Sequence, residues 1–438
     1  MPSQLRKVVL AFVDIVWINH HKNVGHVEGI ERGMRRGRAW LVWGLAAAFY
    51  AYGFFQRVAP SVMVEDLMRD FALGGALLGS LSAVYFYAYA AVQIPVGVLL
   101  DRFGVRRVLI AGTLLAAAGS ALFALAPGLA LATAGRAVVG AAVGFAFIAT
   151  LKLVSGCFPP ERFSLMAGLT LAAGMAGGIA AQAPLGALVE RFGWRPVMLA
   201  GALLALALSL SESRAAAVPD PPGKLPAGLL AILRSAPVWL LTLYAAAMSA
   251  PILALAGLWL VPYLVQAHGL GRTEAGAFAS LMLAAWAAGG PAAGWLALRV
   301  GRLRAMLGGA AVHALCLLAF CLVAQPPLAL ILVLIVLLGL GGGFMIVAYD
   351  QTREIYGSAR SATAMGVVNS AVLLIGAGLQ SLIGLLLDAR WTGLERAGAR
   401  LYLEPAWRAA FTSLALVAAC ALLAALGLRR AARETPQR

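Results

Sequence analysis

Hydrophobic residues in this chain fall into long, nearly unbroken runs, and the polar residues gather in the short stretches between them. A helix that crosses a lipid bilayer needs about 20 mostly apolar residues. Twelve runs approach this length. They predict an all-helical integral membrane protein whose transmembrane helices lie approximately at residues 40–63, 75–100, 108–126, 129–154, 164–189, 196–210, 238–265, 275–298, 305–324, 328–349, 364–387 and 408–428.

A polar segment in the middle of the chain divides these spans into six plus six. It contains the proline-rich, charged sequence VPDPPGKLP, which is typical of a linker. The predicted organisation is an N-terminal six-helix bundle at 39–210, a cytoplasmic linker at 211–236, a C-terminal six-helix bundle at 237–428 and a cytoplasmic tail at 429–438. Residues 1–38 are interpreted as a disordered extension, with Met34, directly before RRGR, as a candidate start of the natural protein.

The composition supports a membrane protein and excludes a soluble one. Apolar residues make up 62% of the chain and charged residues only 12%, against about 45–50% and about 25% in soluble domains. The net charge of +16 does not indicate nucleic-acid binding, because the basic residues lie in short clusters between the apolar runs.

The distribution of those basic residues predicts the orientation. If the N-terminus is inside, the outer loops hold eight of the 34 Lys and Arg residues, two lie within spans, and the remaining 24 are inside. The positive-inside rule therefore predicts that both termini are cytoplasmic. We expect a multi-pass protein of the bacterial inner membrane.

The two predicted bundles carry matching sequences at corresponding places. GVLLDRFGVRR follows the second span and GWLALRVGRLR the eighth, while FPPERFSLMAGL follows the fourth and YGSARSATAMGV the tenth. GWRPV introduces the sixth span and AWRAAF the twelfth. These matches indicate a duplicated six-helix unit. Two such bundles, related by an axis along the membrane normal, place a transport site at their interface.

The loop after the second span carries the most specific motif. It resembles the signature that Major Facilitator Superfamily transporters carry between their second and third helices, and the matching residues are Gly97, Asp101, Arg102, Gly104 and Arg106. Val105 stands where a basic residue is usual. Arg136 and Gly140 resemble the fourth-helix signature of the same family. The resemblance covers the chain from Met34 onward and implies the fold of that superfamily, with twelve transmembrane helices in two six-helix bundles.

Asp101 is a lone carboxylate among arginines, and the resemblance implies a role for it. In the superfamily this residue lies near the cytoplasmic N-terminus of the eleventh helix, where the positive end of the helix dipole favours a carboxylate. The loop is therefore expected to act as a latch that holds the two bundles closed on the cytoplasmic side. The alternative is a solvated loop that serves topology alone.

Two arginines are predicted to lie inside the membrane, where a charge by default indicates function. Arg57 follows Trp40 by 17 residues, which places it roughly 25 Å along the first helix and in the outer part of the membrane. Arg136 lies a few residues into the fourth helix from the outside. The resemblance implies that the first, fourth, seventh and tenth helices line the central cavity.

The first six predicted spans contain no carboxylate in their interiors to pair with either arginine. Since a guanidinium group binds carboxylates and phosphates bidentately, we predict that Arg57, Arg136 or both bind an anionic group of the substrate. The alternatives are that Arg57 reaches the outer lipid interface and that Arg136 bonds helix carbonyls.

Aromatic and acidic residues supply further candidates. Tyr85 and Tyr89 share a helix face because they are four residues apart. Tyr244 and Trp259 of the seventh span are candidates to stack on or hydrogen-bond a substrate, and helix packing is the alternative for all four aromatic residues. Asp350, near the cytoplasmic end of the tenth span, is the candidate proton-binding carboxylate, with an inner charge network as the alternative. The four cysteines lack metal-ligand spacing, so no metal or other cofactor is expected.

These features predict a secondary active transporter of a small organic anion, coupled to protons and working by alternating access. The chain lacks the glycine-rich phosphate-binding motif of ATP-driven pumps, so an ion gradient is expected to supply the work. The alternative is a proton-coupled efflux antiporter for drugs or other amphiphiles. An enzyme is not expected, because no catalytic cluster is predicted on one membrane face. The expected partners are the small-molecule substrate, protons and the lipid bilayer, without nucleic acid, and we expect a monomer.

Overall fold

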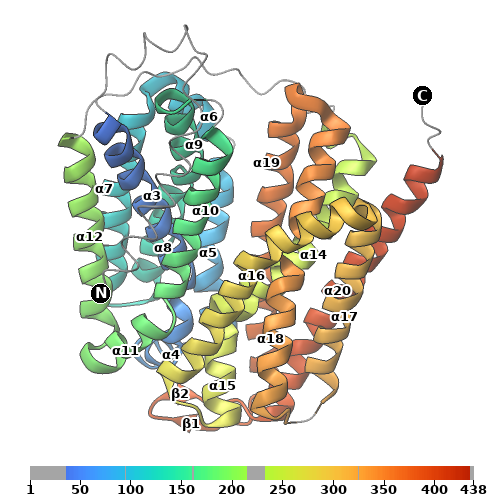
Figure 1. Cartoon of the computed structure of the whole chain (residues 1–438). Coiled ribbons are helices and arrows are strands. Elements are labelled where there is room, and N and C mark those ends of the chain that lie inside the picture. The colour runs from blue at the N-terminus through green and yellow to red at the C-terminus, as the bar shows by residue number, and fades with distance from the viewer. Residues whose placement is uncertain (1–35, 94, 160–161, 215–231, 324, 435–438) are drawn as a thin grey trace, which may run out of the picture.

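The computed structural model describes residues 36–93, 95–159, 162–214, 232–323 and 325–434. These residues are almost entirely helical, and Figure 1 shows the helices gathered into two bundles that lie side by side. The proposed extension before residue 36 and most of the proposed linker lie outside the described residues.

The first bundle holds spans 1 to 6. Its helices are α3 (Arg36–Val58), η1 (Ala59–Val62), α4 (Val64–Phe71), α5 (Gly75–Gln93), α6 (Pro95–Phe103), α7 (Val105–Ala124), α8 (Leu129–Val143), α9 (Ala146–Cys157), α10 (Phe163–Ala180), α11 (Ala183–Phe192) and α12 (Trp194–Arg214). Spans 1, 2, 3 and 6 are α3, α5, α7 and α12. Span 4 combines α8 with α9, and span 5 combines α10 with α11.

The second bundle holds spans 7 to 12. Its elements are α14 (Ala236–Ala254), η3 (Leu255–Trp259), α15 (Leu260–His268), α16 (Arg272–Val300), α17 (Arg302–Leu322), α18 (Leu328–Gly342), α19 (Met345–Asp388), β1 (Glu395–Arg396), β2 (Ala399–Arg400) and α20 (Glu404–Glu434). Span 7 runs through α14, η3 and α15, and spans 8, 9 and 12 are α16, α17 and α20. The long helix α19 ends span 10 and contains all of span 11.

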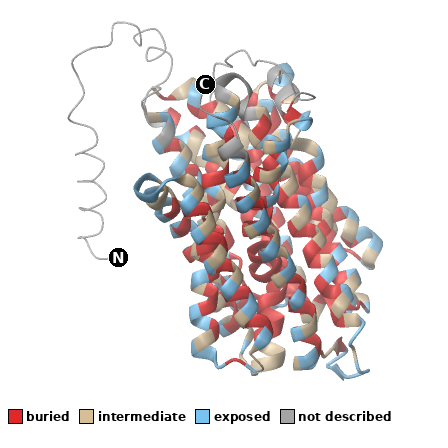
Figure 2. Cartoon of the chain, turned by 90° about the vertical axis from the view of Figure 1, so that its right-hand side faces the viewer, coloured by how far each residue is buried: buried red, intermediate tan, exposed pale blue. Residues whose placement is uncertain are grey.

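The prediction of twelve spans is confirmed. Eleven helical segments of the described chain are long and apolar enough to cross a membrane. The remaining span, α3, is less apolar because it carries Gln56 and Arg57 among its aromatic residues. Buried residues run through the middle of both bundles in Figure 2, while many leucines are exposed on the outside, among them Leu203, Leu315 and Leu416. Such exposed apolar surface is what a lipid bilayer solvates.

One prediction about the first bundle is wrong. Helix α12 ends at Arg214 and not at residue 210, so Glu212 lies inside a span and is only 5% exposed. Thr113 of α7 lies within hydrogen-bonding distance of its carboxyl group, at 2.9 Å. The Gln56 side chain of α3 lies beside Gly201 of α12. Glu212 follows Gly201 by roughly 16 Å along α12. This carboxylate is therefore remote from Arg57.

The ends of the two bundles differ in how closely they approach. We call the end where α12 stops and α14 starts the linker face, and the opposite end, with α4 and the β1–β2 hairpin, the hairpin face (Figure 1). The bundles diverge toward the linker face in this view. Between the bundles, α5 packs against α19, and α10 and α11 pack against α16.

Candidate functional site

Arg57 lies inside the first bundle near its interface with the second. Its residue is only 6% exposed. Its guanidinium carbon lies 4.3 Å from the ring centre of Phe54, 5.4 Å from that of Tyr89 and 5.8 Å from that of Phe86. This burial argues against the alternative that the side chain reaches the lipid interface.

The Arg57 guanidinium carries a charge that the described residues do not neutralise. No carboxylate of the described chain forms an ion pair with it, and its Nε has no hydrogen-bond partner there. Aromatic faces attract a guanidinium by about 0.5–2 kcal/mol each, which offsets only part of the cost of placing a charge inside a membrane protein. The side chain is therefore equipped to bind an anion.

The residues around Arg57 come from both bundles. Tyr85 and Tyr89 do share a helix face, since their ring centres are 6.3 Å apart. Tyr50, two helical turns before Arg57 on α3, also interacts with it electrostatically. Tyr349 of span 10 interacts in the same way with Tyr89 across the interface.

Sequence reasoning did not select Tyr50 or Tyr349 as site residues. The signal for Tyr50 was its seven-residue spacing from Arg57, which puts both side chains on one face of a helix. Tyr349 donates a hydrogen bond of 3.3 Å to Asn369 of span 11, so a second polar group stands beside it. Tyr349 and Asn369 are thus the polar residues that the second bundle places near Tyr89.

Arg136 makes a different set of contacts. It is 1% exposed, and its Nη1 donates a hydrogen bond of 2.7 Å to the backbone carbonyl of Gln56. The guanidinium carbon lies 4.9 Å from the ring centre of Tyr85 and 6.0 Å from that of Phe123. This bond matches the alternative that Arg136 bonds a helix carbonyl, while its Nε and Nη2 have no hydrogen-bond partner among the described residues.

The seventh-span candidates have satisfied polar groups within their own bundle. Tyr244 is fully buried and donates a hydrogen bond of 3.1 Å to the carbonyl of Met306 in α17. Trp259 is also fully buried, and its indole N–H donates a hydrogen bond of 2.9 Å to the carbonyl of Gln380 in α19. Both side chains hold helices of the second bundle together, so the geometry favours packing over substrate contact.

The predicted latch loop lies at the linker face. Helix α6 packs on α5, α7 and α9 of its own bundle. Gly104 starts α7 with a positive φ of 81°, a conformation that favours glycine. Gly301, at the matching place between spans 8 and 9, has a φ of 88°. The sequence repeat therefore corresponds to the same tight turn in both bundles.

The charged residues of this loop contact only the first bundle where the structure describes them. Arg106 donates a hydrogen bond to the carbonyl of Ser213 at the end of span 6. Arg102 is exposed and lies against the ring of Phe103. The side chain of Asp101 is outside the described part of the structure, so the latch remains a prediction.

Asp350 belongs to a surface charge network and not to a buried proton site. Its carboxylate accepts a hydrogen bond from Arg302, which also binds Glu354, and the Asp350 side chain is 52% exposed. The predicted alternative, an inner charge network, matches these contacts. Asp350 as the proton carrier therefore stays a prediction, and the contacts that the structure shows are those of the charge network.

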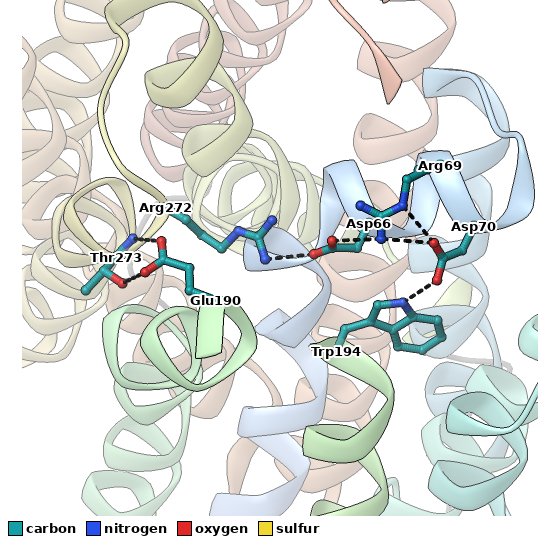
Figure 3. A network of polar contacts seen from close by, with 7 residues as sticks. All are labelled: Asp66, Arg69, Asp70, Glu190, Trp194, Arg272 and Thr273. Carbon is teal, nitrogen blue, oxygen red and sulfur yellow. Dashed lines mark hydrogen bonds and ion pairs between the residues drawn. The ribbon is translucent and has the colours of Figure 1, made fainter. Parts of the chain in front are cut away.

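An ion pair joins the two bundles at the hairpin face. Arg272 of α16 binds Asp66 of α4 at 2.7 Å, as Figure 3 shows. Asp70, one turn further along α4, accepts a hydrogen bond of 2.8 Å from Trp194. Partial burial acts to raise the pKa of Asp70, but the hydrogen bonds from Trp194 and Arg69 outweigh it and hold this pKa below its usual value.

Two carboxylates at this face cap helices of the opposite bundle. Asp388, at the end of span 11, accepts hydrogen bonds of 2.8 Å and 2.9 Å from the backbone N–H groups of Gly75 and Ala76 at the start of span 2. Glu190, at the end of span 5, accepts bonds from the backbone N–H and the hydroxyl of Thr273 at the start of span 8. A helix N-terminus favours a negative charge. Spans 2 and 8 are equivalent in the sequence repeat, so the same kind of carboxylate cap joins the bundles at two places.

We expect the double variant Asp388→Asn, Glu190→Gln to open the hairpin face. Loss of a charge at a helix N-terminus removes about 0.3–2 kcal/mol per site, so the open fraction is expected to rise roughly tenfold. Spin labels at the exposed Leu188 and Leu394, one on each bundle, would report a longer distance. Glu404→Gln is the matched control, because Glu404 pairs with Arg408 inside a single helix. An unchanged distance in the double variant would show that the caps do not hold the face closed.

The side chain of Gln182 connects two irregular helical turns, η1 of the first bundle and η3 of the second. Gln182, which is fully buried between α10 and α11, accepts a hydrogen bond of 3.0 Å from Ser61 in η1 and donates one of 2.7 Å to the carbonyl of Ala256 in η3. The N–H of Leu260, which would bond that carbonyl in a regular α-helix, bonds the carbonyl of Leu255 instead. Gln182 therefore supplies a donor that the π-helical turn of span 7 lacks.

Glycines allow spans 2 and 11 to touch backbone to backbone. A Cβ atom at Gly384 would lie 2.0 Å from the carbonyl oxygen of Gly75, and one at Gly79 would lie 2.5 Å from that of Gln380. Small residues four apart are the usual means of close helix contact in membranes. This contact lies directly beside the Asp388 cap.

Comparison with known proteins identifies relatives over part of the chain. Uncharacterized transporter YybO of Bacillus subtilis is 30% identical over 170 residues, 39% of this chain and 39% of that protein. Monocarboxylate transporter 3 of Rattus norvegicus is 33% identical over 175 residues, 38% of this chain and 34% of that protein. Multidrug resistance protein Stp of Mycobacterium tuberculosis is 28% identical over 145 residues, 33% of this chain and 27% of that protein. The chain thus matches well under half the length of these curated relatives.

The fold and the family extend much further along the chain. A crystal structure of a bacterial homolog to the human lysosomal transporter Spinster, in an inward-facing and occupied conformation, has a TM-score of 0.75 at 18% identity and covers 91% of this chain and 98% of that one. The family model of the Major Facilitator Superfamily matches residues 44–379 and 254–438. The chain therefore belongs to the Major Facilitator Superfamily, a family of membrane transporters and not of enzymes.

Proposed function

We propose that this protein is a secondary active transporter of a small organic monocarboxylate, coupled to protons and working by alternating access. The observation that carries the proposal is Arg57, a 6% exposed guanidinium without a carboxylate partner in the described chain. The positive charge of Arg57 complements a negative charge on the substrate. The aromatic rings around it, those of Phe54, Phe86 and Tyr89, suit an apolar or aromatic body attached to that charge.

The position of the site supports transport and not simple binding. Arg57 and Tyr89 belong to the first bundle, and Tyr349 and Asn369 to the second. A ligand that touches both bundles binds differently when they rock apart, and a ligand shifts a conformational equilibrium only through such a difference in affinity. We propose that the carboxylate binds Arg57 and that the body of the substrate contacts Tyr349.

The conformation described here would be closed to the outside. The count of basic residues favours a cytoplasmic linker face in the bacterial inner membrane, and the bundles meet at the opposite, hairpin face. In this state α6 packs on its own bundle. We propose that the Asp101 loop engages span 11 only when the cytoplasmic side closes.

Efflux of drugs coupled to protons is the second candidate, and the partial likeness to multidrug resistance protein Stp favours it. The aromatic neighbours of Arg57 would accept an amphiphile of either charge. The buried guanidinium opposes a cationic drug, because like charges in a low-dielectric site repel strongly.

A thermal-shift series on the purified protein distinguishes the two. Benzoate and lactate are expected to raise the unfolding temperature by several degrees at saturating concentration, because a ligand that binds only the folded state stabilises it. Inorganic phosphate and tetraphenylphosphonium serve as the dianion and cation comparisons. Stabilisation by tetraphenylphosphonium without any by the carboxylates would contradict the anion proposal and favour efflux. Uptake of the stabilising anion into liposomes, with and without an imposed pH gradient, tests the proton coupling.

A further inference from the structure

The sequence indicates that the last turn of span 1 lacks one backbone hydrogen bond. In an α-helix the carbonyl of residue 56 accepts a hydrogen bond from the N–H of residue 60. Residue 60 is Pro60, which has no N–H. The α-helix accordingly ends at Val58, and the 3-10 helix η1 starts at Ala59. The carbonyl of Gln56 therefore needs a donor from elsewhere.

Arg136 supplies that donor from span 4. Its Nη1 lies 2.7 Å from the carbonyl oxygen of Gln56, and both residues are 1% exposed. An unpaired carbonyl at this degree of burial is costly. The bond thus repairs the defect that Pro60 creates.

The repaired peptide unit is the one that carries Arg57. The carbonyl of Gln56 and the N–H of Arg57 belong to the same peptide group, so holding that carbonyl fixes where the Arg57 side chain starts. Tyr85 supports the same turn, because its hydroxyl donates a hydrogen bond of 2.8 Å to the carbonyl of Gly53 and its ring lies under the Arg136 guanidinium. The Gln56 side chain is held as well, by bonds to Tyr52 and Ser120.

We propose that Arg136 is a positioning residue for the anion site: it replaces the N–H that Pro60 lacks, fixes the turn that presents Arg57, and does not touch the substrate. The proposal rests on the proposed function only in taking Arg57 as the anion-binding residue. The backbone part of it, the coupling between Arg136 and Pro60, holds for any substrate.

The test is a double-mutant cycle between Arg136→Met and Pro60→Ala. Methionine removes the donor, while alanine at position 60 restores the N–H that a regular helix would use. The first readout is the unfolding temperature without ligand, and the second is the dissociation constant for benzoate. Arg136→Met alone is expected to weaken benzoate binding about tenfold and to lower the unfolding temperature, since it leaves a buried carbonyl unpaired. In the Pro60→Ala background both effects are expected to shrink by more than half.

The outcomes separate the role of Arg136 from the identity of the substrate. If Arg136→Met weakens binding by the same factor in both backgrounds, then Arg136 acts on the anion directly and the positioning proposal is overturned. If benzoate does not bind the wild type, or binds Arg57→Met as well as the wild type, the proposed function fails, and the unfolding temperatures alone still decide the backbone proposal. Additive losses in unfolding temperature would overturn it, and a smaller loss in the Pro60→Ala background would support it.

Discussion

An Arg57→Met variant is expected to lose carboxylate binding by roughly 30-fold to 5,000-fold, because removing one partner of a buried, hydrogen-bonded charge pair costs about 2–5 kcal/mol. Methionine keeps the length of the side chain and suits the rings of Phe54, Phe86 and Tyr89 that surround the site. The measurements are the benzoate dissociation constant of the purified protein and the initial rate of uptake into liposomes. The dissociation constant is expected to rise and the uptake rate to fall.

The stability of this variant is expected to stay the same or to increase. The wild-type guanidinium is buried without a carboxylate partner among the described residues, so its removal takes away a desolvated charge and leaves no partner behind. A stable variant that does not bind would separate loss of function from misfolding. Arg191→Met is the matched control, because Arg191 also lies against an aromatic ring, that of Phe192, but is exposed. Benzoate binding that is equally strong in Arg57→Met and the wild type would remove Arg57 from the site.

A Gly384→Val variant is expected to hold the hairpin face open and to abolish transport. Its Cβ atom would lie 2.0 Å from the carbonyl oxygen of Gly75, and 3.0 Å is already closer than real Cβ atoms come. The obstructing atom is backbone, which cannot rotate away, so spans 2 and 11 have to separate. Since backbones approach this closely only at small residues, we expect the closed state to become a minor population.

Cysteine labelling from the outside would measure the effect. Ser280 of α16 lies at the closed interface, where it donates a hydrogen bond to the carbonyl of Ile179. A Ser280→Cys substitution, in a background without the native cysteines, is expected to react with a membrane-impermeant maleimide at least about tenfold faster when Gly384 is valine. Gly378→Val is the control on the same helix, because a Cβ atom there meets nothing within 4 Å. Equal labelling in the two variants would show that the glycine contact does not control closure.

The spans were predictable because their signal is local. A run of about 20 apolar residues has one common explanation, and the structure confirms twelve of them. The errors lie at the ends, where polar residues leave the choice open. Glu212 was assigned to the linker because it stands beside Ser211 and Ser213, yet α12 continues to Arg214 and buries it.

The site was only partly predictable because helix rotation is not encoded in a hydrophobic run. The position of Arg57 along span 1 could be counted from Trp40, but the choice between burial in the bundle and the lipid interface stayed open. The choice between Tyr244 and Tyr349 could not be made in this way, since each is a tyrosine in a cavity-lining span. Only packing shows that Tyr244 bonds Met306 inside its bundle while Tyr349 stands opposite Tyr89. The missing N–H of Pro60 could be read from the sequence. Arg136, which replaces that donor, lies 76 residues further along the chain.

The hydrogen bond from Gln182 to Ala256 indicates how far water must reach between the bundles when the hairpin face is open. This hydrogen bond joins the two bundles, so it must break when they separate at the hairpin face. The freed carbonyl then has no helical N–H to return to, since the Leu260 N–H bonds Leu255. Unpaired backbone at this depth in a membrane is tolerated only where it lines an aqueous space. The cavity that opens at the hairpin face must consequently be hydrated at least down to Ala256.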